Sequence, residues 1–188
     1  MVQVMLASRS PRRRKILEQL GLPFEAVAPD VEEIEFPDDP SAMVCENARR
    51  KWRWCFERFP GAAIIAADTT VELDGRCLGK PSSREEAFAM LRTTSGRVQT
   101  VHTGFVLALP GENPPCAASE VSRVFFRDLT DAGIEAYLDA VQPLDRAGAY
   151  DIDCRGDWII DHCEGSRTNV MGLPAERVQE WMKCKLAL

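Results

Sequence analysis

The most apolar segment of the chain, residues 62–67, is followed directly by an acidic residue, Asp68. A strand with apolar side chains on both sides is typical of a sheet whose two faces are both covered. Segments with helical spacing precede and follow this run, so helices are available to cover it. The segment therefore predicts a sheet enclosed between helices, with a carboxylate at the polar end of this strand.

Strand and helix patterns alternate along the rest of the chain. Apolar runs and alternating patterns predict further strands at residues 2–7, 24–29, 71–73, 76–78, 99–109, 118–126 and 158–161. Capping residues and apolar periodicity predict helices at residues 11–20, 41–58, 83–92, 130–140 and 174–183. This order indicates an α/β fold, a mixed and twisted sheet with flanking helices. With 188 residues the chain has the length of a single domain, which we expect to span residues 1–188.

Charge and cysteine content argue against several classes of protein. Lys and Arg number 23 against 29 for Asp and Glu, a formal net charge of −6, which disfavours general binding to a nucleic-acid backbone. An anionic ligand would then have to be held by a local pocket. The seven cysteines form no C-x-x-C pair, so neither a zinc ribbon nor a thioredoxin-like site is expected. Their odd number, and the absence of a signal peptide or of an apolar run near the roughly 20 residues of a membrane span, indicate a cytoplasmic protein without membrane contact.

The segment S-R-S-P-R-R, residues 8–13, lies at a predicted strand-to-helix junction. The start of a helix offers unpaired backbone N–H groups and the positive end of the helix dipole, which suit a phosphate. Ser8 and Ser10 add hydroxyl donors, and Arg12 and Arg13 add planar guanidinium groups that match phosphate oxygens. The alternative is that Ser10 only caps the helix and that the arginines lie on a solvated face. The motif alone leaves both interpretations open.

Three further residues are candidates because of their charge and position. Asp68 ends a buried strand, where an unpaired carboxylate is costly, so it either caps a neighbouring loop or serves a metal or an attacking water. Lys80 stands between a glycine and a proline that restrict the backbone around it, which suits a phosphate counter-ion. Lys51 lies in a basic cluster of the helix predicted at residues 41–58. A solvated position is the alternative for both lysines.

Six short motifs occur along the chain in one order with compatible spacing. They are L-A-S-x-S-P-R-R at residues 6–13, A-D-T at 67–69, G-K-P at 79–81, S-G at 95–96, A-G-A-Y at 147–150 and V-x-G-L-P at 170–174. Each motif alone is weak, but the ordered set is specific and spans nearly the whole chain. Through this ordered set of motifs the chain resembles the Maf-like nucleoside triphosphate pyrophosphatases, a family named for inhibition of septum formation. The resemblance implies an elongated, two-lobed α/β architecture with a central cleft, like that of inosine triphosphate pyrophosphatases, and often a homodimer.

The resemblance also implies an activity, the hydrolysis of a nucleoside triphosphate between its α- and β-phosphates to a monophosphate and pyrophosphate. It implies a divalent metal, Mg²⁺ or Mn²⁺, with Asp68 and Glu33 at the acidic positions and Asp68 also at the general-base position. Arg12 and Thr69 match positions associated with substrate choice. The phosphate-binding positions fall on Ser8, Arg12, Arg13, Lys51 and Lys80.

One departure from the family pattern concerns the base. The family commonly has G-I-Q-G where this chain has residues 151–154, so Asp153 replaces a glutamine. A glutamine amide can donate to and accept from a uracil or thymine edge, whereas an ionised aspartate only accepts, which suits the adjacent N–H donors of guanine. Asp153 is therefore a candidate specificity residue that puts pyrimidine selection in question. Thr69 and the A-G-A-Y motif instead resemble the branch of the family that acts on dTTP and UTP, so these two nucleotides are the first expectation for the substrate. A second departure from the family pattern, Gln99 in place of a histidine, is expected to matter less.

Two alternatives remain open from the sequence. One is a pyrophosphatase that acts on 7-methyl-GTP, or on deaminated purine nucleotides such as ITP and XTP. The other is a regulator of cell division that binds a nucleoside triphosphate without turning it over. Pyrophosphate release under a divalent metal, lost with a chelator, distinguishes the enzymes from the regulator.

Overall fold

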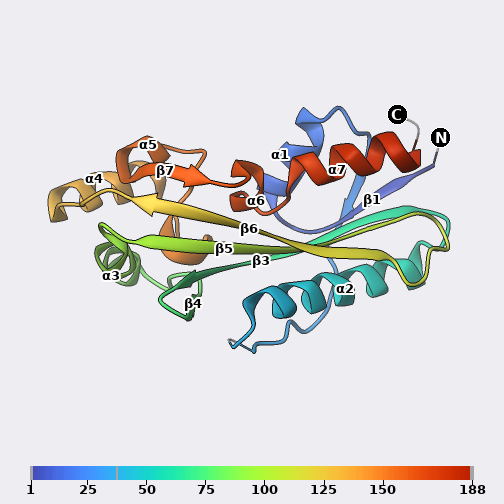
Figure 1. The fold of residues 1–188 in the computed structure, drawn as a ribbon, viewed down its shortest axis with the longest axis horizontal. Coiled ribbons are helices and arrows are strands. Elements are labelled where there is room, and N and C mark those ends of the chain that lie inside the picture. The colour runs from blue at the N-terminus through green and yellow to red at the C-terminus, as the bar shows by residue number, and fades with distance from the viewer. Residues whose placement is uncertain (1, 37, 187–188) are drawn as a thin grey trace.

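The computed structural model describes residues 2–36 and 38–186, which contain one mixed sheet with helices on both faces (Figure 1). The strands are β1 (Val4–Ala7), β2 (Glu25–Val27), β3 (Ala63–Leu73), β4 (Arg76–Leu78), β5 (Val98–Ala108), β6 (Cys116–Phe126) and β7 (Ile160–Glu164). Their order across the sheet is β2-β1-β3-β5-β6-β7, with β4 also paired to β3. Strand β1 runs parallel to β2 and β3, and the other pairs are antiparallel. The predicted mixed α/β sheet with flanking helices is confirmed.

The helices cover both faces of the sheet and one of its ends (Figure 1). They are α1 (Pro11–Gln19), α2 (Pro40–Arg58), α3 (Arg84–Thr94), α4 (Asp131–Val141), α5 (Gly156–Ile159), α6 (Arg167–Val170) and α7 (Ala175–Trp181), with a 3-10 turn (Ala147–Ala149) and a closing π-helical turn (Met182–Leu186). In Figure 1, α2 lies on one side of the long strands β3, β5 and β6, α1 and α7 lie on the other side, and α3 to α5 gather at one end. Within the described residues, no helix is both long enough and apolar enough to cross a membrane.

Strand β3 differs from the prediction in a way that matters for the site. The sequence predicts two strands, at residues 62–67 and 71–73, with Asp68 at the end of the first, but β3 is one continuous strand with Asp68 inside it. Antiparallel pairing with β5 continues past Asp68 and keeps the backbone extended. On its other edge, β3 pairs first with β1 and last with β4, so residues 67–70 have a hydrogen-bonded strand on one side only. Asp68 therefore lies at a gap in the sheet.

A second difference lies near the last strand. Residues 158–161 are predicted to be a strand, but Trp158 belongs to the short helix α5, and β7 begins at Ile160. The pairing of β7 with β6 begins at Ile160, so no ladder holds Trp158 in an extended conformation. Trp158 is 43% exposed.

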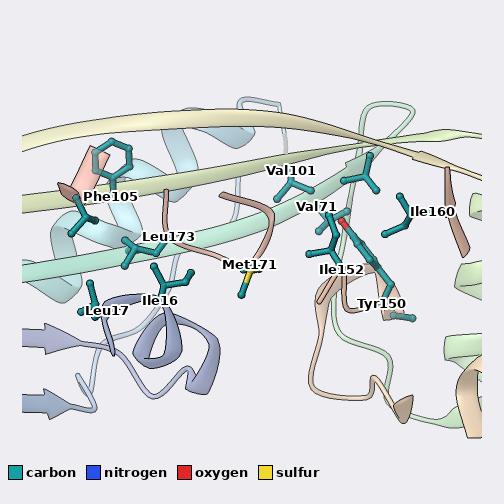
Figure 2. Packing of buried hydrophobic residues seen from close by; sticks show 14 of the residues in the cluster. Ile16, Leu17, Val71, Val101, Phe105, Tyr150, Ile152, Ile160, Met171 and Leu173 are labelled. Carbon is teal, nitrogen blue, oxygen red and sulfur yellow. The ribbon is translucent and has the colours of Figure 1, made fainter. Parts of the chain in front are cut away.

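Apolar side chains pack on both faces of β3, as its sequence predicts. Ile65 belongs to the larger of two buried clusters, which α1 joins through Ile16 and Leu17. Figure 2 shows part of this cluster, with Ile16 and Leu17 beneath the long strands. Ile64 belongs to the smaller cluster, which α2 joins through Trp52. The two clusters hold α1 and α2 on opposite faces of β3, so both helices approach the gap in the sheet.

Gly104 of β5 allows α2 to pack closely on the sheet. A Cβ atom at this position would lie 2.3 Å from the backbone carbon of Val44 and 2.4 Å from the backbone nitrogen of Cys45. Because backbone atoms cannot rotate aside as a side chain can, α2 would have to shift. We expect Gly104→Ala to lower the free energy of unfolding by about 2–4 kcal/mol in urea denaturation. Gly61→Ala is the control, because a Cβ atom there would meet nothing within 4 Å; equal stability of the two variants would contradict the close contact.

Candidate active site

A cavity of about 620 Å³ opens where β3 lacks a neighbour between β1 and β4. Asp68 and Thr69 line it from β3 itself. The rest of its lining comes largely from segments far apart in the sequence. These are residues 7–13 from the end of β1 into α1, parts of residues 145–152 around the 3-10 turn, and residues 170–172 at the end of α6. The fold therefore brings several of the sequence motifs to one cavity.

The cavity lining carries a surplus of positive charge, although the whole chain has a formal net charge of −6. Its charged side chains are six cations and four acids: Arg9, Arg12, Arg13, Lys51, Lys80 and Arg146 against Glu33, Asp68, Asp145 and Asp151. A cleft lined by an excess of one charge raises the local concentration of ligands of the opposite charge. The cavity thus has the properties of the local anion pocket expected from the sequence.

Eight of the nine candidate residues named from the sequence line this cavity: Ser8, Arg12, Arg13, Glu33, Lys51, Asp68, Thr69 and Lys80. The ninth, Asp153, is not part of the lining, and its carboxylate forms ion pairs with Lys15 and Arg167. Asp151 lines the cavity instead, with its Oδ2 accepting a hydrogen bond from Nε of Arg146 at 2.8 Å. Its Oδ1 accepts from the backbone N–H of Asp153 at 2.8 Å. The structure therefore does not bring Asp153 together with the other eight.

Asp68 is held by two side chains from the buried face of α2. Its Oδ1 lies 2.6 Å from Nζ of Lys51, and its Oδ2 accepts a hydrogen bond from Nδ2 of Asn47 at 3.1 Å. The same Lys51 nitrogen lies 2.6 Å from Oε1 of Glu33, on the loop before α2. Two carboxylates therefore converge on one ammonium group, and Lys51 balances part of their charge.

The convergence of Asp68 and Glu33 fits a divalent metal. No group of three or more His, Cys, Asp or Glu residues that could hold a metal is found in residues 2–36 and 38–186. Mg²⁺ is commonly bound by one or two carboxylates together with phosphates of the substrate and waters, so these two acids are enough. The Lys51 ammonium group already shows that a cation is favourable between them. The donor set suits a hard cation whose coordination is completed by a substrate.

Asn47 is a site residue that no motif in the sequence indicates. Asn47 is only 3% exposed, and its side chain binds the loop that carries Glu33. Its Oδ1 accepts a hydrogen bond from the backbone nitrogen of Ile34 at 2.8 Å, and its Nδ2 donates to the carbonyl oxygen of Ile34 at 3.1 Å. Because the same Nδ2 also donates to Asp68, Asn47 holds the two acids relative to each other. The available signal was an amide four residues before Lys51, on the otherwise apolar face of α2.

We expect Asn47→Asp to lower kcat/KM by about tenfold. The new carboxylate would replace a hydrogen-bond donor beside Oδ2 of Asp68, and the two like charges in direct contact would repel each other. Asp68 would then leave the position in which Lys51 and Asn47 hold it. Steady-state kinetics measure the loss. Wild-type kcat/KM in this variant would contradict the contact between Asn47 and Asp68.

Arg13 is a buried cation that faces the cavity from α1. Its Nε donates to the carbonyl oxygen of Gly172 at 2.7 Å, its Nη1 to Oγ of Ser8 at 3.2 Å and its Nη2 to Oγ1 of Thr69 at 2.9 Å. Burial lowers the pKa of Arg13, and the charge of Asp68 opposes this effect, but a guanidinium group stays protonated in proteins. All three acceptors are neutral, so they orient the positive charge without cancelling it.

Arg12 and Lys80 have no hydrogen-bond or ion-pair partner among the side chains of the described residues, although both line the cavity. Burial is the main cause that lowers the pKa of Arg12, and the positive charge of Arg146 lowers it further. A cation that is repelled by a second cation nearby favours the binding of an anion. Both unpaired cations are therefore available to a ligand.

Comparison with known proteins gives one family over nearly the whole chain. The profile of the Maf-like protein family matches residues 3–184. A dTTP/UTP pyrophosphatase of Caldanaerobacter subterraneus subsp. tengcongensis is 40% identical over 183 residues, covering 97% of this chain and 88% of that protein. A dTTP/UTP pyrophosphatase of Thermococcus onnurineus is 42% identical over 175 residues, covering 93% of this chain and 94% of that protein. The chain therefore belongs to the Maf-like protein family.

Proposed function

We propose that this chain hydrolyses dTTP and UTP between the α- and β-phosphates, releasing the monophosphate and pyrophosphate. The observation that carries the proposal is the cavity, which six cationic side chains line together with the buried Asp68. The relatives named dTTP/UTP pyrophosphatase support this choice of nucleotide. The cavity at the gap beside β3 corresponds in this proposal to the central cleft of a two-lobed architecture.

Asp68 is the general base in this proposal. Lys51 and Asn47 hold its carboxylate in place, so it can accept a proton without prior rearrangement. The oxygen of a water molecule attacks the α-phosphorus, the bond from that phosphorus to the bridging oxygen breaks, and pyrophosphate leaves with the electron pair. The proton of the water passes to Asp68.

The cations of the cavity balance the charge of the substrate. A nucleoside triphosphate carries about four negative charges, and phosphoryl transfer is catalysed mainly by positioning and by charge stabilisation. Arg13 is oriented in advance, and Arg12 and Lys80 are unpaired among the described side chains, so all three can contact phosphate oxygens. The hydroxyl group of Ser8 accepts a hydrogen bond from Arg13 and lines the same cavity.

Asp68 and Glu33 would hold Mg²⁺ or Mn²⁺ in this site. The metal would supply charge neutralisation and would make a bound water more acidic. In the same arrangement Lys51 keeps the two carboxylates close together before the substrate arrives. Asn47 holds the loop that carries Glu33 in a fixed position relative to Asp68.

Base selection belongs in this proposal to Arg12 and Thr69, which both line the cavity. The hydroxyl group of Thr69 is bound to Arg13, so an effect of Thr69 on the choice of substrate passes partly through that cation. Asp153 is paired with Lys15 outside the lining, which favours the pyrimidine assignment over a guanine contact by its carboxylate. A homodimer and a cytoplasmic location remain predictions of the sequence.

Pyrophosphate release across a panel of triphosphates tests the proposed function. The panel contains dTTP, UTP, CTP, GTP, 7-methyl-GTP, ITP and XTP, each with Mg²⁺ or Mn²⁺ and with excess EDTA. We expect dTTP and UTP to be hydrolysed with the highest kcat/KM and EDTA to abolish the release. A preference for guanine nucleotides, or for ITP and XTP, would overturn the choice of substrate. Tight binding of triphosphates without any turnover would favour the regulator.

A further inference from the structure

Thr103 of β5 connects the cavity wall to the interior of the sheet. It lies opposite Thr69 of β3 in the antiparallel pair and is 0% exposed. Its Oγ1 lies 3.0 Å from Oγ1 of Thr69 and 3.0 Å from the carbonyl oxygen of Asn169. Thr103 does not line the cavity, so an effect on a ligand has to pass through a neighbour.

The direction of these hydrogen bonds follows from the protons available. A carbonyl oxygen can only accept a hydrogen bond, so the hydroxyl group of Thr103 donates its proton to the backbone carbonyl oxygen of Asn169. Toward Thr69, Thr103 can then only accept, which uses the hydroxyl proton of Thr69. The lone pairs of Thr69 remain, and one of them accepts from Nη2 of Arg13 at 2.9 Å. The donors therefore run in one direction, from Arg13 through Thr69 and Thr103 to the carbonyl oxygen of Asn169.

The end of this chain of hydrogen bonds is firmly held. The buried side chain of Asn169 donates from Nδ2 to the carbonyl oxygen of Val101 at 3.3 Å and to Oγ of Ser122 at 3.0 Å. The backbone carbonyl oxygen of Asn169 also accepts a hydrogen bond from the backbone nitrogen of Gly172 at 2.9 Å. The carbonyl oxygen of Gly172 is the acceptor for Nε of Arg13. Two of the three contacts that orient Arg13, those to Gly172 and Thr69, are therefore connected to the backbone carbonyl oxygen of Asn169.

We propose that Thr103 is a positioning residue for the pyrophosphatase reaction, which orients the Arg13 guanidinium group through Thr69. The identity of the ligand rests on the proposed function, whereas the orientation of Arg13 does not. Without the Thr103 hydroxyl, the proton of Thr69 would turn to the carbonyl oxygen of Gly172, 3.5 Å away, which already accepts from Arg13. That rotation would turn the lone pairs of the Thr69 oxygen relative to Nη2 of Arg13, so the contact that orients the guanidinium group would weaken.

Thr103→Val tests the kinetic consequence, because valine keeps the shape of threonine and removes the hydroxyl group. We expect kcat for dTTP to fall about tenfold, since small misplacements of a positioned group are costly in the transition state. We expect KM to change less than about threefold, because the other cations still bind the ground state. Thr103→Ser restores the hydroxyl group and should return kcat to within about twofold of wild type. Thr103→Ala is measured alongside, so that a folding defect of the valine variant leaves the test intact.

Thr94→Val is the matched control. Thr94 is also 0% exposed, and its hydroxyl group donates to the carbonyl oxygen of Met90 at 2.9 Å and accepts from Nε2 of Gln99 at 2.8 Å. Neither partner lines the cavity, so this variant loses a comparable buried hydroxyl group without a contact to Arg13. It should lose thermal stability and keep kcat. An equal loss of kcat in the Thr94 and Thr103 variants would overturn the proposal.

The Nε–H signal of Arg13 in a ¹H–¹⁵N NMR spectrum tests the orientation without any turnover. The signal is assigned by its loss in Arg13→Lys, and its bond to Gly172 should protect it from exchange in wild type. We expect Thr103→Val to shift the signal and speed its exchange, and Thr94→Val to leave it in place. An unchanged signal in Thr103→Val would overturn the inference even if the enzyme is active. If Thr103→Val changes the signal but the wild-type protein releases no pyrophosphate, the orienting contact is supported and the proposed function is rejected.

Discussion

Asp68→Asn should lower kcat for dTTP by at least about 10³-fold while the affinity for the nucleotide stays within about threefold of wild type. The amide has the shape of the carboxylate but cannot take the proton of the attacking water. Arg12, Arg13 and Lys80 remain to hold the phosphates, so binding should survive. Single-turnover pyrophosphate release measures the chemical step, and calorimetric titration with a non-hydrolysable dTTP analogue measures the affinity.

Asp74→Asn is the matched control for this substitution. Asp74 lies in the turn between β3 and β4, outside the cavity lining, and its φ of 49° is one that asparagine adopts readily. We expect this variant to keep kcat within about twofold of wild type. Turnover of Asp68→Asn at the wild-type rate would remove Asp68 from the role of general base.

Lys51→Met should lower kcat by about 10²-fold. Lys51 lies 2.6 Å from both Asp68 and Glu33, and it is largely buried with Asp68. Without the ammonium group the two carboxylates repel each other and lose the cation that holds them together. Asp68 would then no longer be held in the position from which it accepts the proton of the attacking water. Steady-state kinetics measure the loss.

Arg53 provides the control for Lys51. It lies on the same helix, has no hydrogen-bond or ion-pair partner among the described residues, and does not line the cavity. Arg53→Met removes a cation from α2 and should leave kcat unchanged. A kcat of Lys51→Met equal to that of wild type would show that Lys51 does not hold the two carboxylates.

The local patterns of the sequence predict most of the elements, because caps, turns and apolar periodicity act over a few residues. The continuity of β3 through Asp68 is not such a local property. It depends on pairing with β5 on one edge and on the ends of β1 and β4 on the other, which no local pattern records. The same reason explains why residues 158–161 are predicted to be a strand while the ladder to β6 begins at Ile160.

The candidate site shows the same division. The nine candidate residues could be named from motifs, because a polyphosphate site needs cations, hydroxyl groups and an acid, and eight of the nine line one cavity. Asn47 and Thr103 could not be named, because their importance lies in contacts to Ile34 and Asn169 that only the folded chain creates. The ion pair of Asp153 with Lys15 is likewise a contact between distant segments, which a motif position cannot reveal.

A crystal structure with α,β-methylene-dTTP and Mg²⁺ tests most directly whether this cavity holds a polyphosphate opposite Asp68. We expect phosphate oxygens within about 3.5 Å of Arg13 and Lys80, with the α-phosphorus the phosphorus atom closest to the Asp68 carboxylate. A nucleotide bound with its phosphates outside the cavity, or with Asp68 facing the base, would contradict the proposed site.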